Sequence, residues 1–204
     1  MLDLFLEQLA QTSWVEWLGM LTGIVGVCFS IKQKSTAWPL FITCYFCYIY
    51  ISFQYALHAF MGMNLVFIGI SLYGWFKWTR PQNKDQLKEL PISKTPKKLW
   101  PLIIAFLLIG TFGLGYLLNL LDEASLPYLD AFAASCGFTA QWMLSRKHVE
   151  NWIFWIASDI VYLGLFAINK SIPSMILFTM FIGLAMKGWK DWNKEINPPT
   201  APAA

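Results

Sequence analysis

Long apolar stretches, separated by short polar ones, make up most of the chain. Seven of these stretches are close to the length of about 20 residues that a helix needs to cross a hydrocarbon core of roughly 30 Å. They cover residues 14–31, 38–55, 61–78, 99–121, 130–145, 152–168 and 173–189. The pattern therefore predicts an all-α membrane protein with seven transmembrane helices.

The composition supports this class of protein. Of the 204 residues, 57% are hydrophobic, 17% are aromatic and only 13% are charged, whereas about a quarter of the residues of a soluble protein are charged. Little chain remains outside the seven stretches, so no separate soluble domain is expected. The first dozen residues carry Asp3 and Glu7 but no base. They lack the positive start of a signal peptide, and the first stretch is expected to stay in the mature protein.

The charges predict the orientation, because lysine and arginine near span ends collect on the cytoplasmic side. With seven alternating spans, fourteen of the 15 basic residues share one face and only Lys170 lies on the other. The fourteen are Lys32, Lys34, Lys77, Arg80, Lys84, Lys88, Lys94, Lys97, Lys98, Arg146, Lys147, Lys187, Lys190 and Lys194. The opposite face holds Asp3, Glu7, Glu16, Asp122, Glu123 and Asp130. We expect the N-terminus outside the cell and the C-terminus in the cytoplasm. The net charge of +3 then needs no nucleic-acid partner to explain it.

The chain repeats itself at an offset of 114 residues. The shift aligns Gly23 with Gly137, Trp38 with Trp152, Tyr48 with Tyr162, Met61 with Met175, Phe67 with Phe181 and Gly69 with Gly183. It also aligns a Gly-Trp-x-x-Trp motif at residues 74–78 with the same motif at residues 188–192. Aromatic belts at the membrane surface would not keep this register through the middle of the spans.

The repeat predicts two parallel three-helix units, residues 14–78 and 130–192. A solvated basic loop (79–98) and a linker helix (99–121) lie between them. Two such units face the same way only if an odd number of crossings separates them, and the linker helix supplies one. This 3+1+3 layout is typical of transporters with parallel repeats, whose substrate binds near the midplane where the repeats meet.

Asp159 is the one ionisable residue near the middle of a predicted span. A charged side chain there costs about 2.5 to 3.5 kcal/mol on insertion, so its presence indicates a functional site. Trp152, Trp155 and Tyr162 share its helix face. A carboxylate between aromatic rings suits a flat cationic ligand, which the rings bind by cation–π attraction. The alternative for Asp159 is a packing role, in which it accepts hydrogen bonds from neighbouring hydroxyls. Trp152 alone could instead belong to the belt of aromatic residues at the membrane surface.

Other polar residues inside the spans are candidates for ligand contact. Gln141, Asn64 and Asn151 are the main ones, although such groups also form hydrogen bonds between helices. His58 and His148 lie in short loops and are expected to be solvated.

No motif of an enzyme is present: the chain has no H-E-x-x-H, no Ser paired with a His and no phosphate-binding glycine loop. We expect no catalytic residues, no metal and no cofactor. Cys28, Cys44, Cys47 and Cys136 lie inside spans and are interpreted as packing residues.

Residues 144–159, with their R-K-x-x-E-N-W-x-x-W core, and the Tyr-Gly-Trp end of the third span resemble the PnuC family of nicotinamide riboside transporters. The resemblance covers the chain from about Trp14 to Trp192. It implies a seven-helix fold similar to the SWEET sugar transporters and a homotrimer in the bacterial inner membrane, with a periplasmic N-terminus. It also implies facilitated diffusion of a vitamin precursor that a cytoplasmic kinase traps. A W-x-x-x-N pattern in the sixth span of the family contributes to the substrate site. It maps onto Trp155 and onto Asp159, where this chain has Asp instead of Asn.

The sequence leaves several functions open. Nicotinamide riboside is the first choice, and thiamine or another cationic vitamin is the alternative, because both are flat cations. Proton coupling through Asp159 and a purely structural role for the protein are the other hypotheses.

Overall fold

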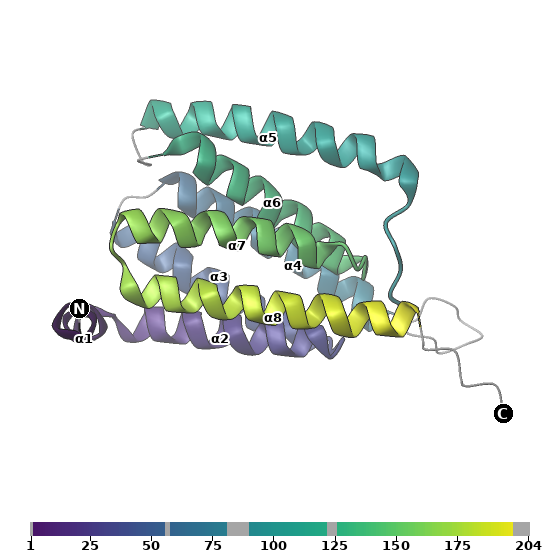
Figure 1. Cartoon of the computed structure of the whole chain (residues 1–204), viewed down its shortest axis with the longest axis horizontal. Coiled ribbons are helices and arrows are strands. Elements are labelled where there is room, and N and C mark those ends of the chain that lie inside the picture. Colours follow the sequence, from purple (N-terminus) through teal and green to yellow (C-terminus); the bar gives the residue numbers. More distant parts are fainter. Residues whose placement is uncertain (1, 56–57, 81–89, 122–125, 198–204) are drawn as a thin grey trace.

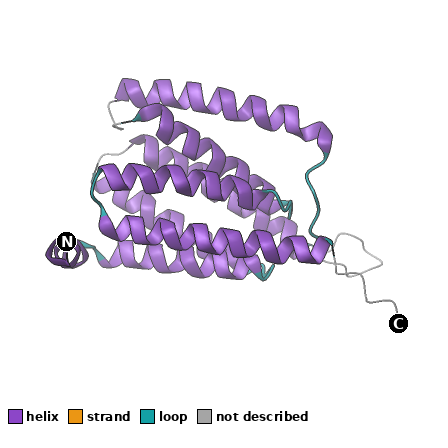
Figure 2. Ribbon diagram, in the orientation of Figure 1, coloured by secondary structure: helices purple, strands orange, loops and turns teal. Residues whose placement is uncertain are grey.

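The computed structural model describes residues 2–55, 58–80, 90–121 and 126–197 of the chain. These residues form eight α-helices, one short 3-10 helix and a single isolated β-bridge between Ser93 and His148 (Figures 1 and 2). The α-helices are α1 (Leu2–Gln11), α2 (Trp14–Ile31), α3 (Ala37–Gln54), α4 (His58–Thr79), α5 (Trp100–Leu121), α6 (Pro127–Ser145), α7 (Asn151–Ile168) and α8 (Ile172–Ile196). The 3-10 helix η1 (Lys97–Leu99) leads into α5.

Helices α2 to α8 coincide with the seven predicted stretches, and α1 is an additional helix that the apolar pattern does not predict. Five segments are long and apolar enough to cross a membrane by length and composition. They are Trp14–Ile31, Ala59–Thr79, Lys97–Leu121, Asn151–Ile168 and Ile172–Ile196. The prediction of an all-α, multi-pass membrane protein is confirmed. The count of seven spans stays a prediction.

Helix α6 is outside that set of five because several of its residues are small or polar. It packs against α4, α5 and α7. Ser135, Thr139 and Gln141 are buried in these contacts together with several alanines. Small and polar side chains suit tight contacts between membrane helices, and they lower the hydropathy of a helix that protein surrounds on several sides.

The helices pack in two groups that follow the chain order. In the first half, α2, α3 and α4 contact one another in sequence, as do α6, α7 and α8 in the second half, while α5 packs on α6. The two halves meet where α2 contacts α8 and where α4 contacts α6 (Figure 1). In both interfaces the first helix of one half therefore packs against the third helix of the other.

The Gly-Trp-x-x-Trp motifs make equivalent contacts across these interfaces. Trp78 Nε1 donates a hydrogen bond to the carbonyl oxygen of Ser145 at 3.2 Å, and Trp192 Nε1 donates to that of Ile31 at 3.0 Å. Both donors and both acceptors are 114 residues apart. Each motif thus links its own half to the end of the first helix of the other half.

The glycines of the two motifs make room for a second pair of tryptophans. A Cβ at Gly74 would overlap the indole of Trp38, and one at Gly188 would overlap that of Trp152. The Trp38 ring lies edge-on to Trp78 and the Trp152 ring edge-on to Trp192, each pair with centroids 5.3 Å apart. The four tryptophans are part of one buried core cluster.

The end of the loop before α5 is docked onto the α6–α7 turn by hydrogen bonds of Ser93 and Thr95. Ser93 N donates to the carbonyl oxygen of Lys147 at 3.0 Å, and Val149 N donates to that of Ser93 at 2.9 Å. Glu150 accepts hydrogen bonds from Thr95 N and Thr95 Oγ1, at 2.9 and 2.7 Å. The prediction of a solvated loop is therefore wrong for Thr95, which is buried, whereas Pro91, Lys94, Pro96, Lys97 and Lys98 are exposed. Residues 81–89 lie outside the described part.

The same docking buries His148, which is 8% exposed and lies 3.0 Å through Nδ1 from Ser93 Oγ. The prediction of a solvated His148 is wrong because the loop that covers it comes from a distant part of the sequence. His58 has no described side chain.

The charges separate along the bundle. The basic residues on the turns between α2 and α3 and between α6 and α7, and those at the ends of α4 and α8, lie at one end, which we call the basic end (Figure 1). The other end carries α1, Glu16 and Asp130, and we call it the acidic end; Lys170 lies there as well. Lys84, Lys88, Asp122 and Glu123 lie outside the described residues. Which end faces the cytoplasm stays a prediction.

Candidate functional site

A cavity of about 560 Å³ lies between the two halves of the bundle. Its walls come from α2, α3 and α4 on one side and from α6, α7 and α8 on the other, with α1 at one end. This volume lies within the range of about 300 to 1,000 Å³ that is usual for small-molecule sites. The cavity occupies the place where parallel repeats are expected to hold a substrate.

The cavity reaches the surface at the acidic end. Gln11 and Tyr55 line it there and are exposed, Tyr55 by 68%. Toward the basic end its lining includes Leu144, Trp152 and Ala185, which are at most 2% exposed. They belong to the buried core cluster that contains the four tryptophans. The structure is thus open toward the acidic end and closed toward the basic end.

Asp159 lines the middle of the cavity from α7 and is 5% exposed. Among the described residues its carboxylate has neither a hydrogen-bond donor nor a basic partner. An isolated carboxylate in a largely apolar wall is unfavourable unless another group compensates its charge. The hypothesis of a packing role, in which neighbouring hydroxyls bond to Asp159, has no such bond to support it.

Aromatic rings surround the space beside Asp159. Tyr45 stacks on Phe67 with ring centroids 5.0 Å apart and an interplanar angle of 13°, and Phe67 lies nearly parallel to Trp155 at 6.4 Å. Tyr162 lies against Phe178 at 5.3 Å. Such faces can stack on a flat ring and attract a cation.

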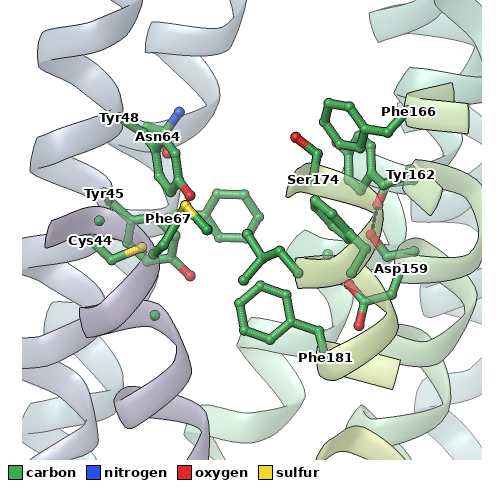
Figure 3. Close-up of a pocket in the computed structure, with 18 of the residues that line it drawn as sticks. Cys44, Tyr45, Tyr48, Asn64, Phe67, Asp159, Tyr162, Phe166, Ser174 and Phe181 are labelled. Atoms are coloured by element: carbon green, nitrogen blue, oxygen red, sulfur yellow. Dashed lines mark hydrogen bonds between the residues drawn. The ribbon is translucent and has the colours of Figure 1, made fainter. Parts of the chain in front are cut away.

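The opposite wall belongs to the first half of the bundle. It carries more polar side chains than Asn64, the one candidate from this half that the sequence predicts. Figure 3 shows Cys44, Tyr45, Tyr48 and Asn64 on one side of the cavity and Asp159 on the other. Asn64 donates through Nδ2 to the carbonyl oxygen of Phe60 at 2.8 Å, which leaves its side-chain oxygen as an acceptor. These residues could contact the hydroxyl groups of a ligand whose ring lies near Asp159.

The repeat relates the two walls position by position. The lining pairs that are 114 residues apart include Gly23 with Gly137, Cys44 with Ser158, Tyr45 with Asp159, Tyr48 with Tyr162, Asn64 with Phe178 and Phe67 with Phe181. Sequence reasoning missed Tyr45, Tyr48 and Phe67 as site residues. Subtracting 114 from the positions of Asp159 and Tyr162 would have found Tyr45 and Tyr48, whereas Phe67 pairs with Phe181, which was not a candidate either.

The glycine pair places two of these rings. A Cβ at Gly137 would lie 3.1 Å from the Phe67 ring, and one at Gly23 would lie 3.6 Å from the Phe181 ring. Gly137 therefore lets Phe67 of the other half approach α6 closely, while Phe181 lies at ordinary contact distance from Gly23. The site is built by both interfaces between the halves.

Five of the seven predicted site residues line this cavity: Asn64, Trp152, Trp155, Asp159 and Tyr162. Gln141 and Asn151 do not. Gln141 donates through Nε2 to Ser71 Oγ at 3.0 Å between α6 and α4, and Asn151 donates through Nδ2 to the carbonyl oxygen of His148 at 2.7 Å in the α6–α7 turn. The structure thus places these two amides in helix–helix and turn contacts.

Glu16 and Asp159 are the only charged side chains in the described lining of the cavity. Because both are acidic, the cavity favours a cation. Among the residues that the structure describes, no group of three or more His, Cys, Asp or Glu side chains could hold a metal ion.

Comparisons with known proteins agree with a transporter. A family model described as nicotinamide mononucleotide transporter matches residues 13–194. The nicotinamide riboside transporter PnuC of Neisseria mucosa is 24% identical over 194 residues, which cover 90% of this chain and 73% of that protein. The riboflavin/roseoflavin transporter RibM of Streptomyces davaonensis is 23% identical over 181 residues, which cover 88% of this chain and 84% of the relative.

A solved structure shares the fold. The crystal structure of the vitamin B3 transporter PnuC aligns with a TM-score of 0.72 at 24% identity, covering 90% of this chain and 82% of that one. The predicted resemblance to the PnuC family is confirmed.

Proposed function

The chain belongs to the nicotinamide mononucleotide transporter family, and from that premise we propose that it carries nicotinamide riboside across the bacterial inner membrane by facilitated diffusion. We infer the substrate class from the carboxylate of Asp159, which is buried among stacked aromatic rings and has no described partner. A pyridinium ring would stack on these rings and supply the missing positive charge.

The rest of the ligand decides between cations. Nicotinamide riboside carries ribose hydroxyls, and Asn64, Tyr45 and Tyr48 offer polar groups on the wall opposite Asp159 (Figure 3). Thiamine has a cationic ring but fewer hydroxyls, so it would leave more of these groups unpaired. Each buried unpaired polar group costs about 1 to 3 kcal/mol, which is enough to rank two ligands of equal charge.

The proposal includes a membrane topology. Seven spans in a 3+1+3 arrangement would comprise units 14–78 and 130–192, the loop 79–98 and the linker helix 99–121. The reciprocal bonds of Trp78 and Trp192 support two equivalent halves. The collection of bases at one end supports a cytoplasmic basic end and a periplasmic acidic end. In this orientation the cavity opens toward the periplasm, where an imported substrate enters.

Family resemblance supports two further parts of the proposal. The protein would form a homotrimer in the bilayer, and a cytoplasmic kinase would trap the product by phosphorylating it. Because facilitated diffusion only equilibrates a substrate, such trapping would give the uptake its direction.

Calorimetric titration of the purified protein with nicotinamide riboside, thiamine and riboflavin tests the substrate. We expect nicotinamide riboside to bind at least ten-fold more tightly than either competitor, a difference of about 1.4 kcal/mol. Tighter binding of thiamine would overturn the choice of substrate, and tighter binding of riboflavin would overturn the cationic class. Uptake into proteoliposomes without a proton gradient tests facilitated diffusion, since transport that needs the gradient would contradict it.

A further inference from the structure

Glu16 lies at the mouth of the cavity, on the first turn of α2. Its side chain is half-buried and lines the cavity together with Gln8, Gln11 and Thr12. Because the cavity opens at the acidic end, a molecule that enters there passes Glu16 before it reaches Asp159.

A helix-capping role explains only part of this carboxylate. Ser13 N donates to Glu16 Oε2 at 2.6 Å, and Glu16 N donates to Ser13 Oγ at 3.2 Å, which together form a capping box. Within the described part of the chain, the other oxygen, Oε1, accepts no hydrogen bond. A glutamine at this position would make the same cap. The hydrogen bonds of the cap therefore do not require a negative charge. The positive end of the α2 dipole favours one at this position, and because Glu16 lines the cavity the same charge also acts on its mouth.

One face of α2 leads from Glu16 into the middle of the cavity. Gly19, Met20 and Gly23 line the cavity along this face, and Gly23 packs against Cys44 and Phe181. Glu16 and Gly23 are separated by about 10 Å along the helix axis. This distance is comparable to the Debye length of about 10 Å at 0.1 M salt, so the field of Glu16 reaches the middle of the cavity.

No base opposes this field within the described lining. Lys170 is the base at the acidic end, and its side chain is exposed and does not line the cavity. A cleft with charges of one sign and apolar walls raises the local concentration of oppositely charged ligands and speeds their association.

We propose that Glu16 is a specificity-determining residue at the entrance, which attracts organic cations and disfavours phosphorylated forms of the same nucleoside. This inference rests on the proposed function, because it takes a pyridinium nucleoside as the entering ligand. A riboside and a mononucleotide differ by one phosphate group, whose negative charge would meet Glu16 first and Asp159 second.

The variant Glu16→Gln tests the inference because it removes the charge and keeps the cap. Glu7→Gln is a matched control: Glu7 is an exposed carboxylate on α1 that does not line the cavity. Stopped-flow tryptophan fluorescence of the purified proteins gives the association rate of nicotinamide riboside at low and high salt. Competition with nicotinamide mononucleotide measures the discrimination against phosphate.

We expect Glu16→Gln to slow association about two- to ten-fold at low salt, to flatten its salt dependence and to strengthen competition by the mononucleotide. Glu7→Gln should change these values less than two-fold. Equal rates in Glu16→Gln and the wild type, or equal losses in both variants, would overturn the inference alone. A wild-type protein that fails to bind nicotinamide riboside would instead refute the proposed function.

Discussion

Replacing Asp159 by Asn removes a charge from the wall of the cavity and leaves the shape of the side chain almost unchanged. Asp159 is 5% exposed, so water screens its charge only weakly. A hydrogen bond to a charged group contributes about 1.5 to 3 kcal/mol. The variant should therefore bind nicotinamide riboside roughly ten- to 150-fold more weakly, at about 1.4 kcal/mol for each factor of ten.

The same substitution should act in the opposite direction on the ligand-free protein. A buried carboxylate without a partner destabilises the folded state, and a neutral amide costs less to bury. Asp159→Asn should thus raise the melting temperature of the empty transporter while it lowers ligand affinity. A packing role for Asp159 predicts the reverse for stability, because the substitution would then break favourable contacts.

Calorimetry and thermal unfolding in detergent measure both effects on one preparation. Asp130→Asn is a suitable control, because Asp130 faces Tyr162 from α6 but does not line the cavity. It should reduce affinity less than Asp159→Asn does. If Asp159→Asn binds the ligand as tightly as the wild type, Asp159 is not a ligand contact, and if it also melts earlier, the carboxylate is a structural residue.

Three further predictions concern the frame of the protein. A topology reporter fused after Asn197, where α8 ends, should be active only in its cytoplasmic form; periplasmic activity at that junction would contradict the seven-span model. Gly188→Ala should destabilise the protein by about 1 to 3 kcal/mol in thermal or denaturant unfolding, because the new Cβ would overlap the Trp152 indole. Gly183→Ala on the same helix is the control: there is open space beside Gly183, so this substitution should be neutral or slightly stabilising. Burial is the main cause that lowers the pKa of His148 below its ordinary value of 6.5; Glu150 opposes this shift and Arg146 adds to it. Below about pH 6.5 the unfolded chain therefore binds more protons than the folded one, so the folded state loses stability as the pH falls from 6.5 through the lowered pKa. Melting curves at about pH 7.5 and 5.5 should show a smaller loss of stability at the lower pH for His148→Gln than for the wild type.

The sequence predicts the membrane class, the helices α2 to α8 and the internal repeat, because these depend on properties that are local or periodic along the chain. Apolar length is enough to identify a candidate span, and an offset of 114 residues can be found by sliding the chain against itself. Asp159 stands out for the same reason: a charge inside an apolar stretch needs no structure to be noticed.

Which side chains share the cavity was decided by the tertiary structure. Gln141 and Asn64 look alike in the sequence, since both are amides inside a span, yet Asn64 lines the cavity while Gln141 bonds to Ser71 between α6 and α4. The difference arises from the rotation of each helix about its axis, which is fixed by the packing of α4 on α6 and of α2 on α8. Likewise, His148 is buried because a loop more than fifty residues earlier in the chain docks on it. These contacts join segments that are remote in the sequence. The local pattern of apolar and polar residues does not show which remote segment packs against a given residue.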